Sequence, residues 1–269
     1  MEYTIGEVSA IVSLSRDMIR YYEKHGAIHA DRNASNRYRT YDTMEVFWLL
    51  EAIMHKSWGI PITEIEEIRK EHYALNTEKF LESEIEIKER EAAYTALLAG
   101  RLRRVRDYMS FGSLNIGNYW VERVPASFIF HLVTGRGDEY ERISMPEEAS
   151  RFIFSETNLP FFDSGFTVHG GRVDWQMRIE DSYVRGLRAS LPEGFVKIPE
   201  ATCLCSNIDI GEIGTFDPSV FSVIREYASS RGYCVKDAAP IRGFILGRGY
   251  ENGHFRRIVR FCLPLEETE

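Results

Sequence analysis

The chain has 269 residues, of which 44% are hydrophobic and 13% aromatic, enough material for more than one packed core. Its formal net charge of -8 at pH 7 excludes a protein that coats DNA indiscriminately, because phosphate binding draws on clustered lysine and arginine. Any nucleic-acid-binding surface is therefore local.

The N-terminal sequence MEYTIGEVSAI lacks the basic and apolar regions of a secretory signal peptide. No later stretch approaches the roughly 20 uninterrupted apolar residues that a membrane span requires. The 4 cysteines all fall in the last quarter of the chain, too few and too unevenly spread for a disulfide framework. We therefore expect a cytoplasmic protein with reduced thiols and no membrane contact.

Residues 1–72 are predicted to form short helices around a small β-wing. Thr4, Ser15 and Thr43 each precede an amphipathic run and suit helix N-caps, and a further run opens after Pro61. Between the second and third helices lies ASNRYRTYD, a polar segment rich in arginine and tyrosine. Its composition favours a wing of short strands over a helix.

From about Tyr73 to Met109 the sequence contains no proline and one glycine, and apolar residues recur at spacings of seven or of three and four. This pattern predicts one long helix over 73–110 with an apolar seam. Its first half is acidic and its second half basic, so antiparallel pairing of two copies brings opposite charges together. We expect an antiparallel homodimer, with a single helix packed on its own domain as the alternative. The seam comprises Phe80, Ile87, Tyr94, Leu98, Leu102, Val105 and Met109.

Residues 111–118, FGSLNIGN, are small and polar and are predicted to form a linker. Beyond them, residues 119–269 show short alternating runs typical of strands, interrupted by two helical windows near 146–157 and 218–230. The order strand, helix, strands occurs twice, which indicates an internal duplication. We expect a C-terminal α+β domain with a curved antiparallel sheet.

Four segments follow one another in the N-terminal quarter: YTIGEVSAIVSLS, IRYYEKHGAI, NRYRTYD and WGIPITEIEEI. In these motifs and their spacing the chain resembles the MerR family of winged helix-turn-helix regulators. The long helix resembles that family's antiparallel dimerisation helix. Residues 119–269 more faintly resemble the gyrase-inhibitor-like effector domain of its multidrug-sensing members. The resemblance implies a mixed fold: an N-terminal all-α winged helix-turn-helix, a long dimerisation helix and a ligand-sensing domain.

In a helix-turn-helix the second helix enters the major groove, while flanking basic and hydroxyl groups hold phosphates. The segment from Arg16 to Arg39 carries six lysines or arginines against three acids, a positive island in an acidic chain. Neighbouring helical residues diverge by about 100°, so one of Tyr21 and Tyr22 is expected to face the core. The predicted DNA-binding residues are Ser15, Arg16, Arg20, Tyr21, Tyr22, Lys24, Arg37, Tyr38, Arg39 and Tyr41.

The resemblance also implies partners and a mechanism. Such dimers bind double-stranded promoter DNA together with RNA polymerase, and the activated dimer bends and untwists an overlong spacer, so that specificity depends partly on DNA deformability. The segment GAIHADRN departs from the family, which usually has an apolar residue and a proline before the wing. The arginine and tyrosine pattern of the wing is unaffected.

Metal- and redox-sensing members of the family bind their effector through cysteines at the far end of the dimerisation helix, and residues 100–120 contain none. Cys203 and Cys205 lie two apart on a predicted strand and offer an alternative metal site with Cys234 or His254. Strand cysteines are more often small core residues. We expect no metal and no cofactor, and a small organic molecule as the effector.

The C-terminal half is rich in aromatic residues, which line pockets for drug-sized ligands when they do not fill a core. Where the family often has a glutamate facing a cationic drug, PIRGFI has Gly243, and Arg260 replaces an acid of the last strand. Either another acid meets the cation or the ligand is not a cation. We expect a bulky, largely apolar ligand that can carry positive charge. The predicted ligand-binding residues are Tyr119, Trp120, Phe128, Asp163, Phe166, Asp174, Trp175 and Met177.

No GxSxG, HExxH or P-loop signature occurs, and His131, His169 and His254 are scattered singly. We therefore expect a regulator without catalytic residues. Two alternatives stay open. The effector domain is a small-molecule hydrolase in the first, and a ligand-free protein-interaction module on a DNA-binding repressor in the second.

Overall fold

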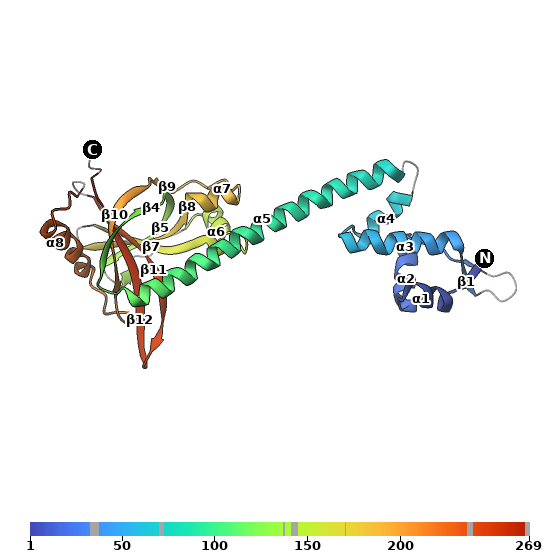
Figure 1. Cartoon of the computed structure of the whole chain (residues 1–269), viewed down its shortest axis with the longest axis horizontal. Coiled ribbons are helices and arrows are strands. Elements are labelled where there is room, and N and C mark those ends of the chain that lie inside the picture. Colours follow the sequence, from blue (N-terminus) through green and yellow to red (C-terminus); the bar gives the residue numbers. More distant parts are fainter. Residues whose placement is uncertain are drawn as a thin grey trace. The chain divides into compact units, whose positions relative to one another are not determined.

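The computed structural model describes residues 1–32, 38–69, 73–136, 138–140, 145–169, 171–235 and 239–266. The chain divides into two compact units, Met1–Ala92 and Ala93–Glu269. The mixed fold class predicted from the sequence is confirmed: short helices with a small sheet, one long helix, and an α+β unit with an antiparallel sheet (Figure 1). None of the helices in the described part of the chain is long and apolar enough to cross a membrane.

The first unit combines four short helices with a three-stranded sheet of order β1-β3-β2. Thr4 forms a capping box with Glu7, and Ser15 accepts a hydrogen bond from the Met18 backbone N–H, as the sequence predicted. The third helix is capped by Asp42 and not by Thr43, because the Asp42 carboxylate accepts the Glu45 N–H at 2.7 Å. The elements are β1 (Glu2–Thr4), α1 (Ile5–Val12), α2 (Arg16–Lys24), β2 (Asp31–Arg32), β3 (Arg39–Asp42), α3 (Thr43–Trp58) and α4 (Ile62–Arg69).

The core of the first unit joins all four helices. Val8 of α1, Ile19 of α2, Leu49 of α3 and Ile65 of α4 are each almost fully buried in one cluster. This apolar contact stabilises the angles between helices too short to persist alone.

A single long helix, α5 (Tyr73–Leu114), follows. It ends four residues later than the predicted boundary at 110, so the first four residues of the predicted linker 111–118 are helical. The reason lies in Phe111, whose ring packs edge-on against Trp120 at 5.0 Å. This contact gives the last turn of the helix an apolar packing partner, which the small and polar composition of the segment does not predict.

The second unit contains a nine-stranded sheet of order β4-β10-β12-β11-β7-β8-β5-β6, with β9 also paired to β5. All its strand pairs are antiparallel. The elements are β4 (Tyr119–Val124), β5 (Ser127–Arg136), β6 (Glu139–Tyr140), α6 (Glu147–Ile153), η1 (Leu159–Phe161), β7 (Phe162–His169), β8 (Arg172–Glu180), α7 (Asp181–Gly186), β9 (Phe195–Ile198), β10 (Ala201–Asp209), η2 (Pro218–Ser222), α8 (Val223–Ser230), β11 (Ile241–Glu251) and β12 (His254–Pro264).

The strand order bears out the predicted duplication. In each half a strand and a helix precede a hairpin, β5-α6-β7-β8 and β10-α8-β11-β12, and the first strand pairs with the last. The halves meet through β7 and β11, where Gly165 lies opposite Phe244 and Phe166 lies opposite Gly243. The two Gly-Phe pairs therefore occupy equivalent positions about a local two-fold axis.

The sheet has two chemically different faces. The helix face packs on α6 and α8 and is apolar, with Phe130 and Met177 in one cluster and Phe166 and Phe261 in another. The opposite side, which we call the α5 face, carries Gln176, Arg178, Arg242, Phe244, Arg260 and Cys262. The C-terminal half of α5 contacts this face, with the Tyr108 ring 5.6 Å from the Phe244 ring.

Gly243 provides a test of this packing. A Cβ there would lie 2.2 Å from the Arg260 carbonyl oxygen and 2.4 Å from the Phe166 ring. We predict that Gly243→Ala lowers the free energy of unfolding by about 1–3 kcal/mol, since added volume forces the strands apart. Urea unfolding followed by near-ultraviolet circular dichroism measures the loss.

Gly249→Ala is the matched control on the same strand. No heavy atom lies within 4 Å of the added Cβ, so its unfolding should change by less than about 0.5 kcal/mol. Equal stability of the two variants would contradict the packing described for Gly243.

Candidate nucleic-acid interface and ligand cavity

Helix α2 presents a row of basic side chains. The Ser15 hydroxyl accepts the Met18 N–H at 3.2 Å and so fixes where the helix begins. Arg16, Arg20 and Lys24 follow on the helix and are exposed. An exposed basic helix that starts at a defined cap suits insertion beside a phosphate backbone.

The tyrosine pair of α2 divides between surface and core. Tyr21 is 38% exposed, whereas Tyr22 is 3% exposed and belongs to the core of the first unit. Tyr21 is therefore the tyrosine available to DNA. Tyr22, included among the predicted DNA-binding residues, is a packing residue.

The described part of the wing also contains one surface and one core tyrosine. Tyr38 is 72% exposed, but Tyr41 is buried and its hydroxyl donates to Glu23 Oε2 at 3.2 Å. Burial, reinforced by the Glu23 charge, raises the pKa of Tyr41 to about 12. The prediction that Tyr41 contacts DNA is wrong, because its ring fills the core between the sheet and the helices. Arg37 lies outside the described residues.

Helix α2 and the wing meet at a shared depression of about 380 Å³, lined by Arg20, Tyr38 and Arg39 among others. Arg20 pairs with Asp17 at 3.0 Å, and Arg39 Nε pairs with Glu23 at 3.1 Å. Both guanidinium groups are about half exposed, and exposed ion pairs of this kind contribute little. A phosphate can therefore replace the acid at small cost.

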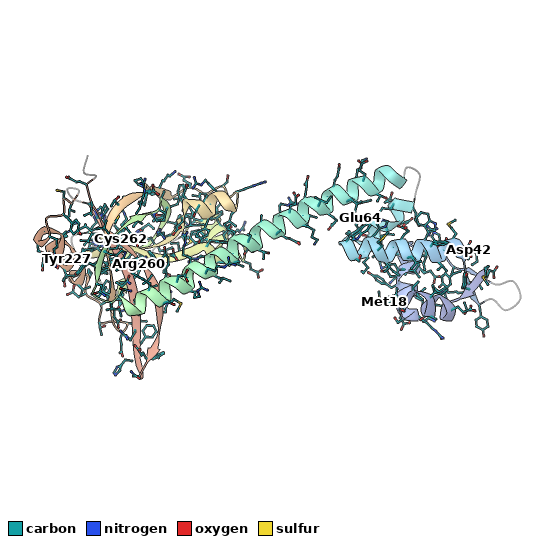
Figure 2. All side chains as sticks on the ribbon, in the orientation of Figure 1. Met18, Asp42, Glu64, Tyr227, Arg260 and Cys262 are labelled. Atoms are coloured by element: carbon teal, nitrogen blue, oxygen red, sulfur yellow. The ribbon has the colours of Figure 1, made fainter. Side chains whose placement is uncertain are left out.

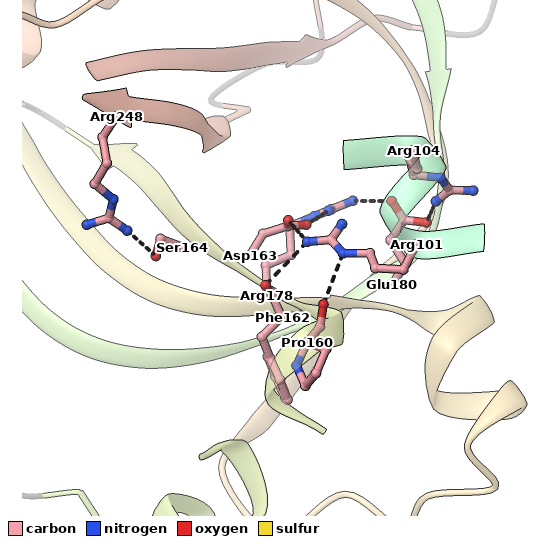
Figure 3. Close-up of polar contacts among 9 residues, drawn as sticks. All are labelled: Arg101, Arg104, Pro160, Phe162, Asp163, Ser164, Arg178, Glu180 and Arg248. Atoms are coloured by element: carbon pink, nitrogen blue, oxygen red, sulfur yellow. Dashed lines mark hydrogen bonds and ion pairs between the residues drawn. The ribbon is translucent and has the colours of Figure 1, made fainter. Parts of the chain in front are cut away.

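In the second unit, an ion-pair network joins α5 to the sheet (Figure 3). Arg101 donates to Asp163 Oδ1 at 2.5 Å, and Arg178 of β8 donates to Asp163 Oδ2 at 2.9 Å. Arg104 pairs with Glu180, which also lies 3.6 Å from Arg178. Burial opposes charge on Arg101, but Asp163 outweighs it and raises the pKa of Arg101. Asp163, predicted to meet a ligand, is thus committed to two arginines.

The network predicts a large effect of Asp163→Asn on stability. The substitution leaves Arg101 and Arg178 buried without a full counter-charge, which costs about 3–5 kcal/mol when a buried pair is broken. Differential scanning calorimetry should show a lower melting temperature.

Asp107→Asn serves as the control, since Asp107 pairs with Arg106 at an exposed site on α5, the helix that carries Arg101. Its effect should stay within about 1 kcal/mol. A melting temperature for Asp163→Asn as high as that of the control would refute the assigned role.

Beside this network lies a cavity of about 360 Å³ on the α5 face. Its walls are mainly apolar, and the charged residues among them are Arg178 and Arg242. Ser127 and Gln176 add polar groups; Thr167 donates to Gln176 Oε1, which leaves the amide nitrogen uncommitted to that bond. The lining residues are Val124, Pro125, Ser127, Ile129, Gln176, Arg178, Ile198, Pro199, Ala201, Cys203, Ala239, Pro240, Arg242, Gly243, Phe244, Cys262 and Pro264.

None of the predicted ligand-binding residues lines this cavity. Trp175 and Met177 point to the helix face with Phe166, because side chains alternate along β8 and their neighbours Gln176 and Arg178 take the cavity side. Phe128 also packs with the helix-face cluster. Trp175 and Met177 therefore pack into the apolar interior between the sheet and its helices and do not reach this cavity.

The remaining three lie elsewhere. Tyr119 stacks on Tyr227 of α8 at 4.0 Å. Asp174 accepts a hydrogen bond from Thr134 at 2.7 Å. Trp120 lies on the α5 face, but its ring contacts Arg260 instead of the cavity.

Arg260 occupies an aromatic cage within the protein. Its guanidinium carbon lies 4.7 Å from the Tyr108 ring centroid, 5.4 Å from that of Phe111 and 5.1 Å from that of Trp120. The Glu122 carboxylate accepts a hydrogen bond from Arg260 at 3.2 Å, and Arg260 is 4% exposed. Figure 2 labels Arg260 and Cys262 on β12, and Tyr227 on α8. The arrangement has the components of a cation-binding site, already filled by the chain's own cation.

Three cysteines lie together on the α5 face, with Cys205 Sγ 3.1 Å from Cys262 Sγ and Cys203 beside them. Cys234 is exposed, and His254 lies near Glu212 at the surface. Within the described ranges, no group of three histidine, cysteine or acidic side chains is arranged to hold a metal ion. The proposed grouping of Cys203 and Cys205 with Cys234 or His254 is therefore not formed.

None of the cavity residues was predicted, and Arg242 stands out among those that the sequence analysis missed. An arginine in a strand that otherwise reads as apolar, as in PIRGFI, was the available signal. The interpretation of this segment rested on the adjacent Gly243, whose missing side chain would point into the helix face.

Comparison with known proteins assigns the N-terminal segment. Residues 4–41 match the model of the MerR family regulatory proteins. No curated protein matches the chain.

Solved structures similar to the chain include MerR regulators. A MerR family transcriptional regulator from Bacillus cereus shares 17% identity, with 41% of this chain and 83% of that chain covered and a TM-score of 0.34. EcmrR, in a complex with DNA and the RPo assembly, shares 15% identity over 99% of this chain and 100% of that chain, with a TM-score of 0.33. A hydrolase from Listeria innocua shares 14% identity over 56% of this chain and 93% of that chain, with a TM-score of 0.31.

Proposed function

We propose that the protein is a ligand-responsive transcription regulator that binds promoter DNA as a dimer. The observation that carries the proposal is the match of residues 4–41 to the MerR family model, a segment in which Arg20, Tyr38 and Arg39 line one depression. These side chains supply a local basic surface in a chain whose net charge is -8. Such a surface holds the backbone of a duplex and positions the helix that reads it.

Exposed apolar side chains support the dimer. Phe47, Leu50 and Met54 are between 40% and 60% exposed at helical spacing on α3, and Leu102 of α5 is 62% exposed. A stripe of this kind on a protein surface marks an interaction site. Phe80, Tyr94 and Leu98 of the predicted seam pack within the chain instead. The proposed dimer contact therefore draws on α3 as well as on the rest of α5.

The cavity supports the sensor. Its volume of about 360 Å³ falls in the range of small-molecule sites. Arg178 belongs both to the cavity wall and to the network that holds α5. A ligand that changes the contacts of Arg178 therefore also changes how the network anchors α5. In this proposal α5 takes part in both sensing and dimerisation. The proposed output is distortion of a promoter spacer that RNA polymerase then engages, most simply as an activator.

The hydrolase alternative has little support from the cavity. Among the described lining residues, Ser127 and two cysteines are potential nucleophiles, but no histidine or carboxylate stands beside them as a general base.

Substitutions in the depression test DNA binding. We predict that Arg20→Ala and Arg39→Ala each weaken binding at least about tenfold, because each removes a charge-assisted phosphate contact. Gel shifts on genomic promoter fragments selected by the unaltered protein provide the measurement. Arg151→Ala, at an exposed site on α6, should bind normally. Full binding by both test variants would refute the interface.

Introduction of a negative charge into the α3 stripe tests the dimer. Phe47→Glu and Met54→Glu should shift the protein toward monomer, since a charge buried at an apolar interface is unfavourable. Sedimentation velocity gives the association state. Val196→Glu, at another exposed apolar position, is the control and should remain dimeric. A monomeric unaltered protein would overturn the dimer, whatever the variants do.

A further inference from the structure

Arg242 extends from β11 onto the cavity side of the sheet. It lies opposite Thr167 of β7 and Cys262 of β12, near the start of its strand. Among the described residues it forms no ion pair, and its buried Nε has no hydrogen-bond partner. Arg242 is part-buried, and a guanidinium nitrogen removed from water without an acceptor is unfavourable unless a ligand supplies one.

Desolvation adds to this imbalance. Burial lowers the pKa of Arg242, in contrast to Arg101 and Arg104, whose acid partners raise theirs. The second cavity arginine, Arg178, is already bound to Asp163. The unsatisfied positive charge in the cavity is therefore that of Arg242.

The residues that line the cavity do not favour a cationic ligand. The described lining residues include no aspartate or glutamate. Asp163 is bound to two arginines, and the aromatic cage with Glu122 is filled by Arg260. A cationic ligand would meet two guanidinium groups and no available counter-charge.

The other polar groups of the cavity suit an oxyanion instead. The Ser127 hydroxyl and the Gln176 amide line the same cavity, and both carry hydrogen-bond donors. The apolar remainder, including Ile129, Ile198 and Phe244, suits a hydrocarbon body. A guanidinium group pairs with a carboxylate through two parallel hydrogen bonds.

We propose that the cavity binds an organic acid with an apolar body, whose carboxylate pairs with Arg242. This inference rests on the proposed sensor function and specifies its ligand class. Charge selection at this site separates the chain from a sensor of cationic drugs.

Three probes with one carbon skeleton test the proposal: 2-naphthoate, 2-naphthamide and 2-naphthylmethylamine. Isothermal titration of the full chain at neutral pH should show 2-naphthoate binding about 10- to 100-fold more tightly than the neutral amide, the gain of a charge-assisted pair. The amine should bind most weakly.

Arg242→Gln should remove the preference for 2-naphthoate over 2-naphthamide, and Arg242→Lys should keep part of it because the charge remains. Arg248→Gln is the matched control, since Arg248 lies on the same strand but outside the cavity. It should keep the full preference. Without ligand, Arg242→Gln should melt no lower than the unaltered protein, because the charge it removes has no partner.

The outcomes separate the two proposals. Amide or amine binding as tightly as 2-naphthoate would overturn the acid proposal and leave the sensor intact, as would an unchanged preference in Arg242→Gln. Failure of all three probes to bind would overturn both. If Arg242→Gln does not fold, the group is structural and the acid proposal fails.

Discussion

The C-terminal half of α5 is held on the sheet by two buried carboxylates. Asp163 and Glu180, on neighbouring strands, face Arg101 and Arg104 from the helix and Arg178 from the sheet. A network of this type adds little net stability over apolar packing, but loss of one member leaves an uncompensated charge. It therefore specifies one position of the helix strongly. The same helix, through Phe80 near its start, packs on the core of the first unit, so one continuous element carries both sets of contacts.

The two faces of the sheet make different contacts. Rings of the helix face, such as Phe166 and Phe261, bind the sheet to its helices, while the alternate residues on the α5 face contact α5 or line the cavity. Because consecutive strand residues point to opposite sides, Met177 and Arg178 serve different purposes although they are neighbours in sequence. The duplicated halves each contribute one arginine to the cavity, Arg178 from the first and Arg242 from the second.

Local sequence signals predicted the first unit well. The capping residues Thr4 and Ser15, and the division of Tyr21 from Tyr22, follow from helix geometry alone. Tyr41 could not be placed in this way, since its burial depends on Glu23 from another element. In the second unit, periodicity identified strands but not which face meets the helices. The face that meets the helices is set by strand pairing between residues distant in sequence, such as Gly243 and Phe166. A single sequence does not show such pairing.

Arg260 has a consequence for the chemistry that the protein tolerates. A guanidinium group enclosed by Tyr108, Phe111 and Trp120 acts as a permanent internal occupant, held by covalent attachment and by Glu122. Quaternary ammonium dyes and similar lipophilic cations would have to displace a tethered competitor whose effective concentration never falls. The last strand itself thus closes the aromatic cage to such compounds, independent of how selective the neighbouring cavity is.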